Sequence, residues 1–276
     1  MISLLSKNDK IFVAGHKGMV GSAICRALQK KGYRNILKAS REDLDLANIY
    51  DVRNWYKEHK PDVVILAAAT VGGIQANNNF PVDFLLNNLK IQNNVIETSW
   101  RSDVKRLLFL GSSCIYPKLS NQPIKEEELL TGSLEPTNEC YALAKITGIK
   151  LCMALKKQYN FDAISLMPTN LYGPGDNYHP TNSHVLPAFI RRFVEASERG
   201  DKVVTCWGSG LPMREFLHVD DLGDACVFVL EKWQPSVDEI QYLNVGTGID
   251  LTIKELAEEV SIATNFSGKI IWDKSK

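Results

Sequence analysis

Five side chains of this 276-residue chain have types and spacings that could do chemistry together. Tyr141 and Lys145 are one helical turn apart, Ser112 and Cys114 follow an apolar run, and His184 lies further along the chain. Tyr, Lys and Ser suit the reduction of a carbonyl group, whereas Cys and His suit the removal and return of a proton. If all five meet at one cofactor, a single site could do both kinds of chemistry.

The first three residues fit the proton supply that a carbonyl reduction needs. A phenol with a pKa of about 10 is a poor acid at neutrality, so a neighbouring ammonium must lower that pKa. Lys145 follows Tyr141 by four residues and shares its helix face, so it could supply this field and also hold a nicotinamide ribose. Ser112 could orient the carbonyl oxygen.

The Tyr-x-x-x-Lys spacing is weak by itself, because Tyr56 and Lys60 repeat it on an earlier predicted helix. The later pair differs in its context. Ser112 ends a predicted strand and Tyr141 begins the helix that follows, and ligands of α/β proteins bind at the carboxyl ends of the strands. We therefore predict that Tyr141, Lys145 and Ser112 converge at that edge, and that Tyr56 and Lys60 are structural.

A glycine-rich loop follows the first predicted strand and opens the first predicted helix. Its G-x-x-G-x-x-G spacing differs from the commoner G-x-G-x-x-G, but its glycines allow a tight turn and close approach of a pyrophosphate to the helix amino terminus. Strand, loop and helix in this order predict a dinucleotide site. The predicted cofactor contacts in this loop are Gly15, His16, Lys17, Gly18, Met19, Val20 and Gly21.

The end of the second predicted strand decides between NAD and NADP. An acid there binds the ribose hydroxyls of NAD, whereas an Arg takes the 2′-phosphate of NADP. Arg41 is the candidate cation, helped by Lys17, and it favours NADP as the cofactor. Glu42 and Asp43 stand beside it and could argue the reverse.

Short apolar runs alternate with amphipathic segments along the first part of the chain, in the rhythm of βαβ units. The strands are apolar on both faces, as a parallel sheet covered on both sides requires. This pattern predicts an α/β fold with a Rossmann-type doubly wound parallel sheet. The predicted strands are 11–14, 35–39, 62–68, 106–110 and 163–167, and the predicted helices are 20–31, 49–60, 82–100, 139–159 and 220–232.

The composition of the chain shifts after the fifth predicted strand. From 168 to 187 it is rich in Pro, Asn, Gly and His, which marks a departure from the sheet. Thr252 and Glu255 form a capping-box signature for one more helix. We predict an NADP-binding Rossmann domain over 1–170 and, over 171–276, a smaller, mainly substrate-binding domain interleaved with late Rossmann elements.

Charge, hydropathy and cysteine usage exclude several classes of protein. The 32 Lys and Arg balance the 32 Asp and Glu, so no strong field attracts nucleic acid or an anionic membrane. The longest apolar stretch, 63–71, is too short to span a bilayer, and the amino terminus has no apolar core with a cleavage site. Six cysteines without paired spacing indicate a reducing compartment. We expect a cytoplasmic protein without a metal site.

These segments resemble the extended short-chain dehydrogenase/reductases and, within them, the GDP-L-fucose synthase family, also called GDP-4-keto-6-deoxy-D-mannose epimerase/reductases. The match runs nearly end to end. The glycine loop and the Tyr-x-x-x-Lys pair occur throughout the superfamily, whereas the Ser-Ser-Cys, Asn-Ser-His and Pro-Met-Arg-Glu-Phe segments are more specific. The matching segments are 15–21, 67–74, 111–117, 135–138, 141–145, 168–174, 179–184 and 207–221.

This resemblance implies that NADPH reduces the C4 ketone of a GDP-4-keto-6-deoxy sugar after C3 and C5 have been inverted, and that the enzyme is a homodimer. Inversion beside a ketone needs a base on one face and an acid on the other, and the resemblance gives these roles to Cys114 and His184. A thiolate is basic enough if nearby positive charge lowers its pKa, and His donates a proton near neutrality.

The resemblance also implies the remaining contacts. Arg192 and Arg214 would hold the diphosphate, where a planar fork matches two oxygens, and Trp207 would contact the sugar or the base. Further cofactor contacts, some shared with the catalytic set, would be Leu110, Gly111, Ser112, Ser113, Lys145, Pro168, Thr169, Asn170, Leu171 and His184.

Two departures from the family pattern leave alternatives open. Lys17 stands where the family more often has Arg, which keeps the charge but loses the bidentate fork. The family continues beyond the position of Lys276, so we expect a substrate domain truncated at its end. One alternative is a related nucleotide-sugar epimerase or dehydratase, which would use the Tyr and Lys without the Cys and His. The other is a catalytically impaired, truncated cofactor-binding protein.

Overall fold

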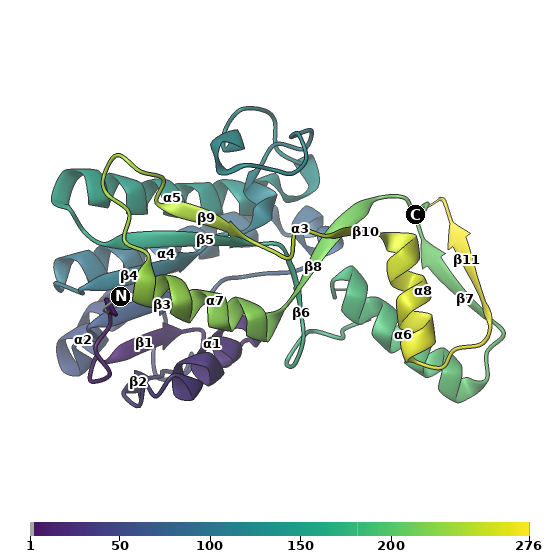
Figure 1. Cartoon of the computed structure of the whole chain (residues 1–276), viewed down its shortest axis with the longest axis horizontal. Helices are drawn as coiled ribbons and strands as arrows, with labels where there is room; N and C mark the ends of the chain where they lie inside the picture. Colours follow the sequence, from purple (N-terminus) through teal and green to yellow (C-terminus); the bar gives the residue numbers. More distant parts are fainter. Residues whose placement is uncertain (1–2, 181, 276) are drawn as a thin grey trace.

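A six-stranded parallel sheet forms the main body of the protein (Figure 1), which a computed structural model describes over residues 3–180 and 182–275. Its strands are β1 (Ile11–Ala14), β2 (Ile36–Leu37), β3 (Val63–Leu66), β4 (Arg106–Leu110), β5 (Ala163–Pro168) and β9 (Tyr242–Val245). They lie in the order β2-β1-β3-β4-β5-β9, and every neighbouring pair is parallel. From β1 the sheet extends in one direction to β2 and in the other direction to β3 and the later strands. The strand order therefore switches between β1 and β3, and doubly wound sheets bind their ligands at such a switch point.

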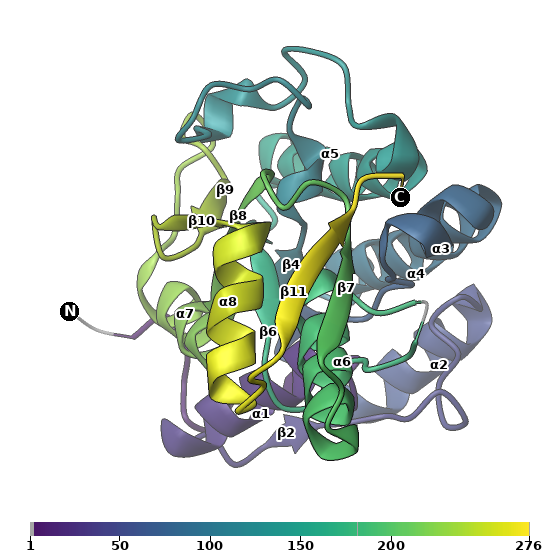
Figure 2. The same ribbon diagram turned by 90° about the vertical axis from the view of Figure 1, so that its right-hand side faces the viewer.

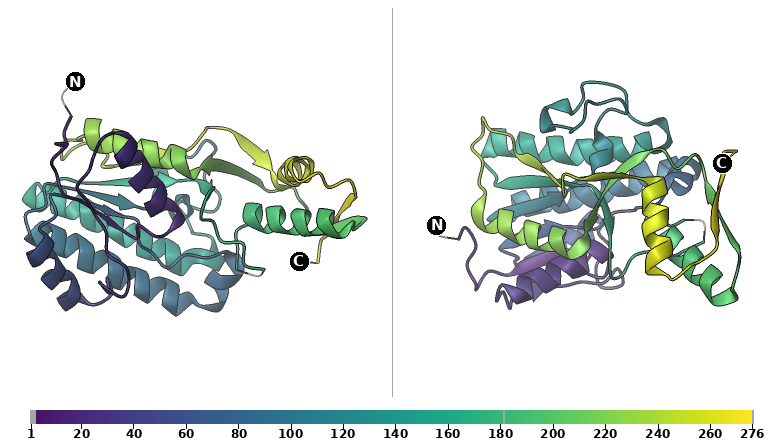
Figure 3. Two further views of the ribbon diagram at one scale, coloured as in Figure 1. Left: turned by 90° about the horizontal axis from the view of Figure 1, so that it is seen from below. Right: turned by 45° about the vertical axis from the view of Figure 1, so that its right-hand side comes forward.

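Helices cover both faces of this sheet, as Figure 3 shows from below. The helices are α1 (Met19–Lys30) and α7 (Val219–Lys232) on one face, and α2 (Ile49–His59), α4 (Pro81–Arg101) and α5 (Glu139–Tyr159) on the other. Along β1 the side chains alternate, with Phe12 packed toward α2 and Val13 toward α1, and both are buried. Each such burial stabilises the fold by about 1.5–3 kcal/mol. The predicted α/β fold with a doubly wound sheet is confirmed.

The later part of the chain builds two small sheets and a separate apolar core beside the main sheet (Figures 1 and 2). The elements are β6 (Asn170–Tyr172), α6 (Val185–Arg199), β7 (Val203–Trp207), β8 (Met213–His218), β10 (Asp250–Thr252), α8 (Ile253–Ala263) and β11 (Lys269–Asp273). The sheets have the orders β10-β8-β6 and β11-β7. Phe193 of α6 and Val260 of α8 both belong to this core.

The chain passes back and forth between these two parts. After β8 it returns to the main sheet, where α7 packs against α1 and β9 pairs with β5. It then leaves again through β10 and α8. The last strand of the main sheet therefore comes from late in the sequence, so residues near the carboxyl edge of that sheet come from both parts.

The structure differs from the sequence prediction mainly at short strands. The second strand is only Ile36–Leu37, because it lies at the edge of the sheet and is half-buried. The stretch 168–187 is not simply irregular, since it contains β6 and the first residues of α6. Elements that the prediction did not name are α3 (Ile74–Asn79), β6 to β11, α6, and the short helices η1 (Ser113–Ile115), η2 (Glu126–Glu128) and η3 (Pro136–Asn138).

The long helices agree with the prediction within one or two residues at each end. The capping box of α8 is also confirmed, because the Glu255 amide donates to the Thr252 hydroxyl at 3.1 Å and the Glu255 carboxylate accepts from the Thr252 amide at 2.7 Å. No helix among the described residues is long and apolar enough to cross a bilayer.

Candidate active site

Four of the five predicted catalytic residues form one cluster at the carboxyl edge of the main sheet. Ser112 lies just past the end of β4 and caps η1, and its hydroxyl accepts from the Cys114 amide at 3.4 Å. The same hydroxyl lies close enough to the Tyr141 phenol and the Cys114 thiol to favour the charged forms of both, because it acts to lower both of their pKa values. A single serine thus joins the residue suited to carbonyl reduction to the residue suited to proton abstraction.

Lys145 forms the buried floor of this cluster. Its side chain is 4% exposed, and its ammonium donates to the Leu110 carbonyl at 2.8 Å. The ammonium lies 5.7 Å from the centre of the Tyr141 ring and 4.9 Å from that of Phe109. Desolvation lowers the pKa of Lys145 to about 8, and the negative charge of the Cys114 thiolate opposes this shift.

The acidic groups of the cluster have raised pKa values, contrary to the sequence expectation. Desolvation raises the pKa of Cys114 to about 11, although Ser112 and the Lys145 charge act in the other direction. Desolvation also raises the pKa of Tyr141, with the Cys114 charge adding to it and Ser112 opposing it. At Cys114 the expected lowering by the Lys145 ammonium is outweighed, because burial penalises the charged thiolate more strongly.

His184 stands apart from these four residues. It occupies the N-cap position of α6, with an extended backbone (φ −71°, ψ 167°). Although the residue is exposed, surrounding protein desolvates the imidazole enough to lower its pKa, and the Asp176 carboxylate opposes this shift. Its charge partner is therefore Asp176 and not a member of the Ser112 cluster.

The glycine loop needs glycine at two positions, because the backbone around it leaves no space for a side chain. Gly15 has a φ of +90°, a conformation that side-chain-bearing residues rarely adopt, and a Cβ there would lie 2.7 Å from the Ala68 amide nitrogen. A Cβ at Gly21 would lie 2.2 Å from the Gly15 carbonyl oxygen, so loop and helix approach closely. The loop delivers the chain to the amino terminus of α1, whose first amides are free to face an anion.

Positive charge gathers beside this loop. Desolvation lowers the pKa of His16, and the charges of Lys38 and Lys17 lower it further. The His16 Nδ1 atom is buried and has no hydrogen-bond partner among the described residues. Lys38 was not predicted as a site residue, although it lies at the end of the second predicted strand. Counting every cation from that strand to Arg41 would have found it.

The acid beside Arg41 is engaged within its own turn. The Asp43 carboxylate accepts from the Ser40 hydroxyl at 2.6 Å and from the Ser40 amide at 3.0 Å. These bonds, and then the Lys17 charge, lower the pKa of Asp43. Arg41 is exposed on the same turn. Asp43 thus serves the local backbone, which weakens the case for it as a ribose ligand.

The three predicted substrate contacts all lie in the later part of the chain. The Arg192 guanidinium lies 5.6 Å from the centre of the Trp207 ring and donates to the Thr205 carbonyl at 2.7 Å. Trp207 is 53% exposed, so about half of the residue is accessible at the surface. Arg214 is exposed on β8 and donates to the Met213 carbonyl at 2.7 Å.

The predicted contacts after β5 are joined to β8 through a residue that the sequence prediction missed. The Thr169 hydroxyl and the Asn170 amide both donate to the Glu215 carbonyl at 2.9 Å. The Glu215 carboxylate in turn accepts from the Gly248 amide at 2.6 Å and from the Thr247 hydroxyl at 3.1 Å. Glu215 directly follows Arg214 in the segment 207–221. Its place beside a predicted substrate contact is the feature of the sequence that pointed to it.

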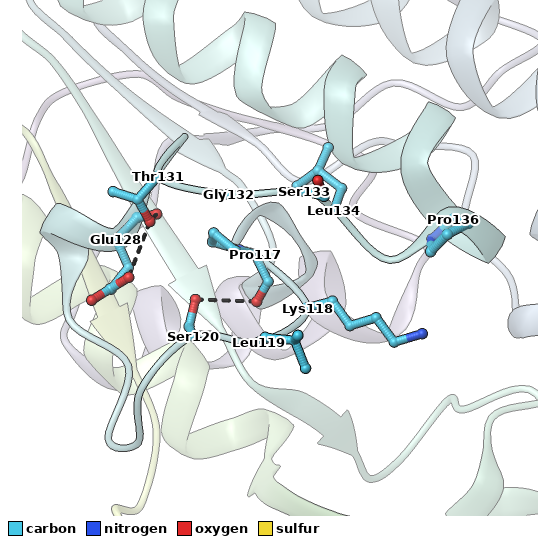
Figure 4. Close-up of a pocket in the computed structure, with 10 residues that line it drawn as sticks. All are labelled: Pro117, Lys118, Leu119, Ser120, Glu128, Thr131, Gly132, Ser133, Leu134 and Pro136. Atoms are coloured by element: carbon cyan, nitrogen blue, oxygen red, sulfur yellow. Dashed lines mark hydrogen bonds between the residues drawn. The ribbon is translucent and has the colours of Figure 1, made fainter.

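Figure 4 shows a surface hollow of about 490 Å³, and none of the four clustered residues lines it. It is lined by Pro117, Lys118, Leu119, Ser120, Glu128, Thr131, Gly132, Ser133, Leu134 and Pro136. None of these is a predicted site residue. We place the site at the Ser112 cluster, because that cluster holds the residues predicted for the reduction and the proton abstraction and the hollow holds none of them.

The described residues contain neither a disulfide nor a cluster of metal-binding side chains. All six cysteines are described, and each of them is free. Within residues 3–180 and 182–275, no group of three or more His, Cys, Asp or Glu side chains could hold a metal ion.

Comparison with known proteins defines the class. The model of the NAD dependent epimerase/dehydratase family matches residues 11–246, and the chain belongs to this family. GDP-L-fucose synthase 1 of Arabidopsis thaliana is 56% identical over 274 residues, which cover 99% of this chain and 84% of that protein. GDP-L-fucose synthase of Escherichia coli (strain K12) is 50% identical over 273 residues, covering 97% and 85%. The structure of GDP-mannoheptose C4 reductase from Campylobacter jejuni with NADP bound has a TM-score of 0.89 and 38% identity, covering 98% of this chain and 88% of that one.

Proposed function

We propose that this chain is an NADPH-dependent GDP-L-fucose synthase. It inverts C3 and C5 of GDP-4-keto-6-deoxy-D-mannose and then reduces the C4 ketone. The observation that carries the proposal is the clustering of Ser112 and Cys114 with Tyr141 and Lys145: the Ser112 hydroxyl accepts from the Cys114 amide, and the Lys145 ammonium lies 5.7 Å from the centre of the Tyr141 ring. The residues for the reduction and for the proton abstraction can therefore act on one substrate. The names of the relatives at 50–56% identity support the same substrate.

The cofactor proposal is NADP, and the residues around the glycine loop fit it. Gly15 and Gly21 let the loop pack closely on the backbone around it, which brings the amino terminus of α1 to the place where a pyrophosphate would bind. Lys17, Lys38 and Arg41 could meet a 2′-phosphate. When bound, NADPH supplies the hydride for the reduction. The engagement of the neighbouring acid with its own turn favours NADP over NAD, as does the NADP of the related C4 reductase.

For the inversion, the chain must supply a base and an acid on opposite faces of the sugar. The Cys114 thiolate takes a proton from the carbon next to the ketone, and the electron pair of that bond moves into an enolate. His184 then gives a proton to the same carbon from the other face. The Ser112 hydroxyl and the Lys145 charge favour the thiolate, while burial disfavours it.

For the reduction, Tyr141 donates its phenolic proton to the C4 oxygen as that oxygen gains charge. The raised pKa keeps this phenol protonated at neutral pH. Ser112 holds the same oxygen, and the Lys145 ammonium stabilises the phenolate that remains. The GDP moiety is proposed to meet Arg192, Arg214 and Trp207, whose cations and exposed aromatic residue suit a diphosphate and a base.

The decisive experiment mixes the purified protein with GDP-4-keto-6-deoxymannose and NADPH in deuterated water. The absorbance of NADPH reports the reduction, and deuterium at C3 and C5 reports the inversion. We expect Cys114→Ser to lower deuterium uptake by about 100- to 10,000-fold, the usual contribution of a general base. Cys140→Ser is the matched control, because Cys140 is the neighbour of Tyr141 and is also partly exposed.

Three results would separate the alternatives. NADPH oxidation without deuterium uptake would indicate a simple reductase or a related epimerase that does not use Cys114. Binding of NADPH with neither activity would indicate an impaired cofactor-binding protein. Equal losses in Cys114→Ser and Cys140→Ser would contradict the role of Cys114 as the base.

A homodimer is also proposed, on the basis of an apolar face shared by α4 and α5. Val82 and Leu86 on α4 are 68% and 46% exposed, and Leu143 on the neighbouring α5 is 41% exposed. A second copy of the chain would cover this face. Light scattering should give twice the chain mass, and Leu86→Glu should halve it. Phe228→Glu is the control, because Phe228 is 62% exposed on α7, on the opposite face of the sheet.

We propose a cytoplasmic location for this enzyme. Six free cysteines suit a reducing compartment. Fluorescence microscopy of a tagged chain tests this, and a signal confined to an oxidising compartment would contradict it.

A further inference from the structure

The turn between β3 and α3, residues 70–73, is held by two buried asparagines. Asn88 is 2% exposed, and its side chain accepts from the Thr70 amide at 2.8 Å and donates to the Thr70 carbonyl at 3.0 Å. Asn77 is 8% exposed and donates to the Gly72 and Gly73 carbonyls at 2.8 and 3.1 Å. Buried amides with several backbone partners fix a loop in one conformation, so this turn is a rigid part of the structure.

One glycine of the turn faces the reduction machinery. A Cβ at Gly72 would lie 3.1 Å from the Phe84 ring and 3.0 Å from the Ala76 Cβ. The Phe84 ring meets the Tyr141 ring edge to face, with their centres 6.2 Å apart and an interplanar angle of 79°. Asn88 also donates to the Phe84 carbonyl at 2.6 Å, so the turn and the Phe84 ring are held together. Gly72 therefore contacts the group that packs on the catalytic phenol.

The other glycine faces the segment that carries His184. A Cβ at Gly73 would lie 3.0 Å from the Ser183 carbonyl oxygen and 3.7 Å from its carbonyl carbon. This neighbour is backbone, so it cannot relax by a change of rotamer, and His184 is the next residue along the chain. The backbone of Gly73 itself (φ −66°, ψ 178°) suits alanine, so an added methyl group would act only through this contact.

We propose that Gly73 is a positioning residue for His184, because its lack of a side chain lets the Ser183 backbone rest against the turn. The adjacent Gly72 makes the corresponding contact toward Tyr141 through Phe84. The turn thus sets the separation between the acid of the inversion and the acid of the reduction. This inference rests on the proposed function, in which His184 is the acid of the inversion.

The test compares Gly73→Ala with Gly72→Ala in two assays. Deuterium uptake at C3 and C5 reports the inversion. Single-turnover oxidation of GDP-L-fucose by NADP⁺ reports the redox step without prior inversion. We expect Gly73→Ala to lower deuterium uptake by about tenfold or more, because small misplacements of a catalytic group are costly, and to leave the oxidation within about twofold. Gly72→Ala should lower the oxidation of GDP-L-fucose and leave deuterium uptake nearly unchanged.

Val71→Ala is the control from the same turn, because Val71 is 64% exposed, and it should change neither rate. A third readout does not depend on activity. Proton NMR of the His184 imidazole, assigned with His184→Gln, should show its pKa moving toward the ordinary value in Gly73→Ala and unchanged in Gly72→Ala, because the displaced segment becomes better solvated.

Failure of the inference and failure of the proposed function give different results. A wild-type protein that neither exchanges deuterium nor oxidises GDP-L-fucose contradicts the function, whereas the NMR measurement still tests the contact. Equal losses in both assays for Gly73→Ala, or no loss in either with an unchanged imidazole pKa, overturn the positioning role. If Gly73→Ala does not fold, Asn77→Ala with the NMR readout of the His184 pKa replaces it, because it releases the Gly72 and Gly73 carbonyls while Asn88 still holds Thr70 and the Phe84 carbonyl.

Discussion

Two Tyr-x-x-x-Lys pairs occur in this protein, on α2 and on α5, and they have opposite environments. Tyr56 is 1% exposed and shares a hydrogen bond of 2.9 Å with the Ser99 hydroxyl, while Lys60 lies past the end of α2 and is exposed. On α5 the lysine is the buried member, because Lys145 is 4% exposed while the Tyr141 residue is half-buried. The same spacing thus leaves the ammonium exposed in one case and buries it in the other.

The comparison shows that the environment of the lysine, more than that of the tyrosine, distinguishes the pair suited to catalysis from the structural pair. Burial raises the phenol pKa in both Tyr56 and Tyr141, so a raised tyrosine pKa does not distinguish them. The lysines differ in burial, because Lys60 is exposed while Lys145 is buried and desolvation lowers the pKa of Lys145 to about 8. A buried ammonium costs stability, and proteins tolerate such groups mainly where they act on a substrate or a cofactor.

Exchanging each tyrosine for phenylalanine should give the largest difference between the two helices. Tyr141→Phe removes the proton donor of the reduction, and we expect NADPH oxidation to fall by about 100- to 10,000-fold. Tyr56→Phe removes only a buried hydrogen bond, so it should keep the activity and lower the free energy of unfolding by about 1 kcal/mol. Steady-state assays and urea unfolding measure these effects. Loss of activity in both variants would contradict the distinction.

Replacing the buried lysine should make the protein more stable while inactivating it. Lys145 has a pKa of about 8 when folded and an ordinary value of 10.5, so the unfolded chain binds its proton more tightly. The cost of burial is fully present below about pH 8 and disappears as the pH rises toward 10.5. At neutral pH, Lys145→Met should therefore raise the free energy of unfolding by roughly 3 kcal/mol, at about 1.4 kcal/mol per pKa unit.

Urea unfolding at neutral pH and near pH 10.5 checks this sign, with Lys60→Met as the control. The stability gain of Lys145→Met should shrink at the higher pH, and Lys60→Met should show no such change. A Lys145→Met protein that is less stable at neutral pH would mean that the bond to the Leu110 carbonyl outweighs the desolvation of the ammonium.

The reduction itself should lose rate above the pKa of Lys145. If the ammonium form is the active one, kcat/KM for NADPH oxidation falls about tenfold per pH unit above about pH 8. Deuterium uptake without NADPH should behave differently, because the Cys114 thiolate becomes more abundant with rising pH while protonated His184 becomes scarcer. At pH values between the lowered pKa of His184 and the pKa of about 11 of Cys114, these two trends cancel, so deuterium uptake should change little with pH. Parallel profiles for the two assays would contradict the separate roles.

The sequence predicts the main sheet well because the strands of that sheet are runs of buried, mostly apolar residues. The strand 106–110 agrees with β4 residue for residue, since all five of its side chains are buried. The strand Asn170–Tyr172 was missed, because its residues are exposed or half-buried and the Pro- and Asn-rich composition around it resembles a loop. Periodicity reports burial, so strands that bury little leave little trace in the sequence.

The candidate site could be predicted as a set of residues but not as an arrangement. The order of strand and helix was enough to bring Ser112 and Tyr141 together. The sequence did not reveal that desolvation outweighs the Lys145 charge in the pKa of Cys114, because burial depends on the whole fold. It also gave no sign that the Glu215 carbonyl receives two of the predicted contacts or that Gly73 touches the Ser183 backbone.

The smallest expected effect concerns the backbone conformation at the ends of the two helices that carry the pairs. Lys60 ends α2 with a φ of 48°, in the left-handed region, and its amide donates to the Tyr56 carbonyl at 2.9 Å. Lys60→Gly should relieve this conformation and raise the free energy of unfolding by a few tenths to about 1 kcal/mol, without loss of activity. Asn160 ends α5 with a φ of 54°, and Asn160→Gly should gain less, because asparagine tolerates that region better than lysine. Urea unfolding measures both gains, and a fall in NADPH oxidation in Lys60→Gly would mean that the Tyr-x-x-x-Lys pair on α2 is more than a helix end.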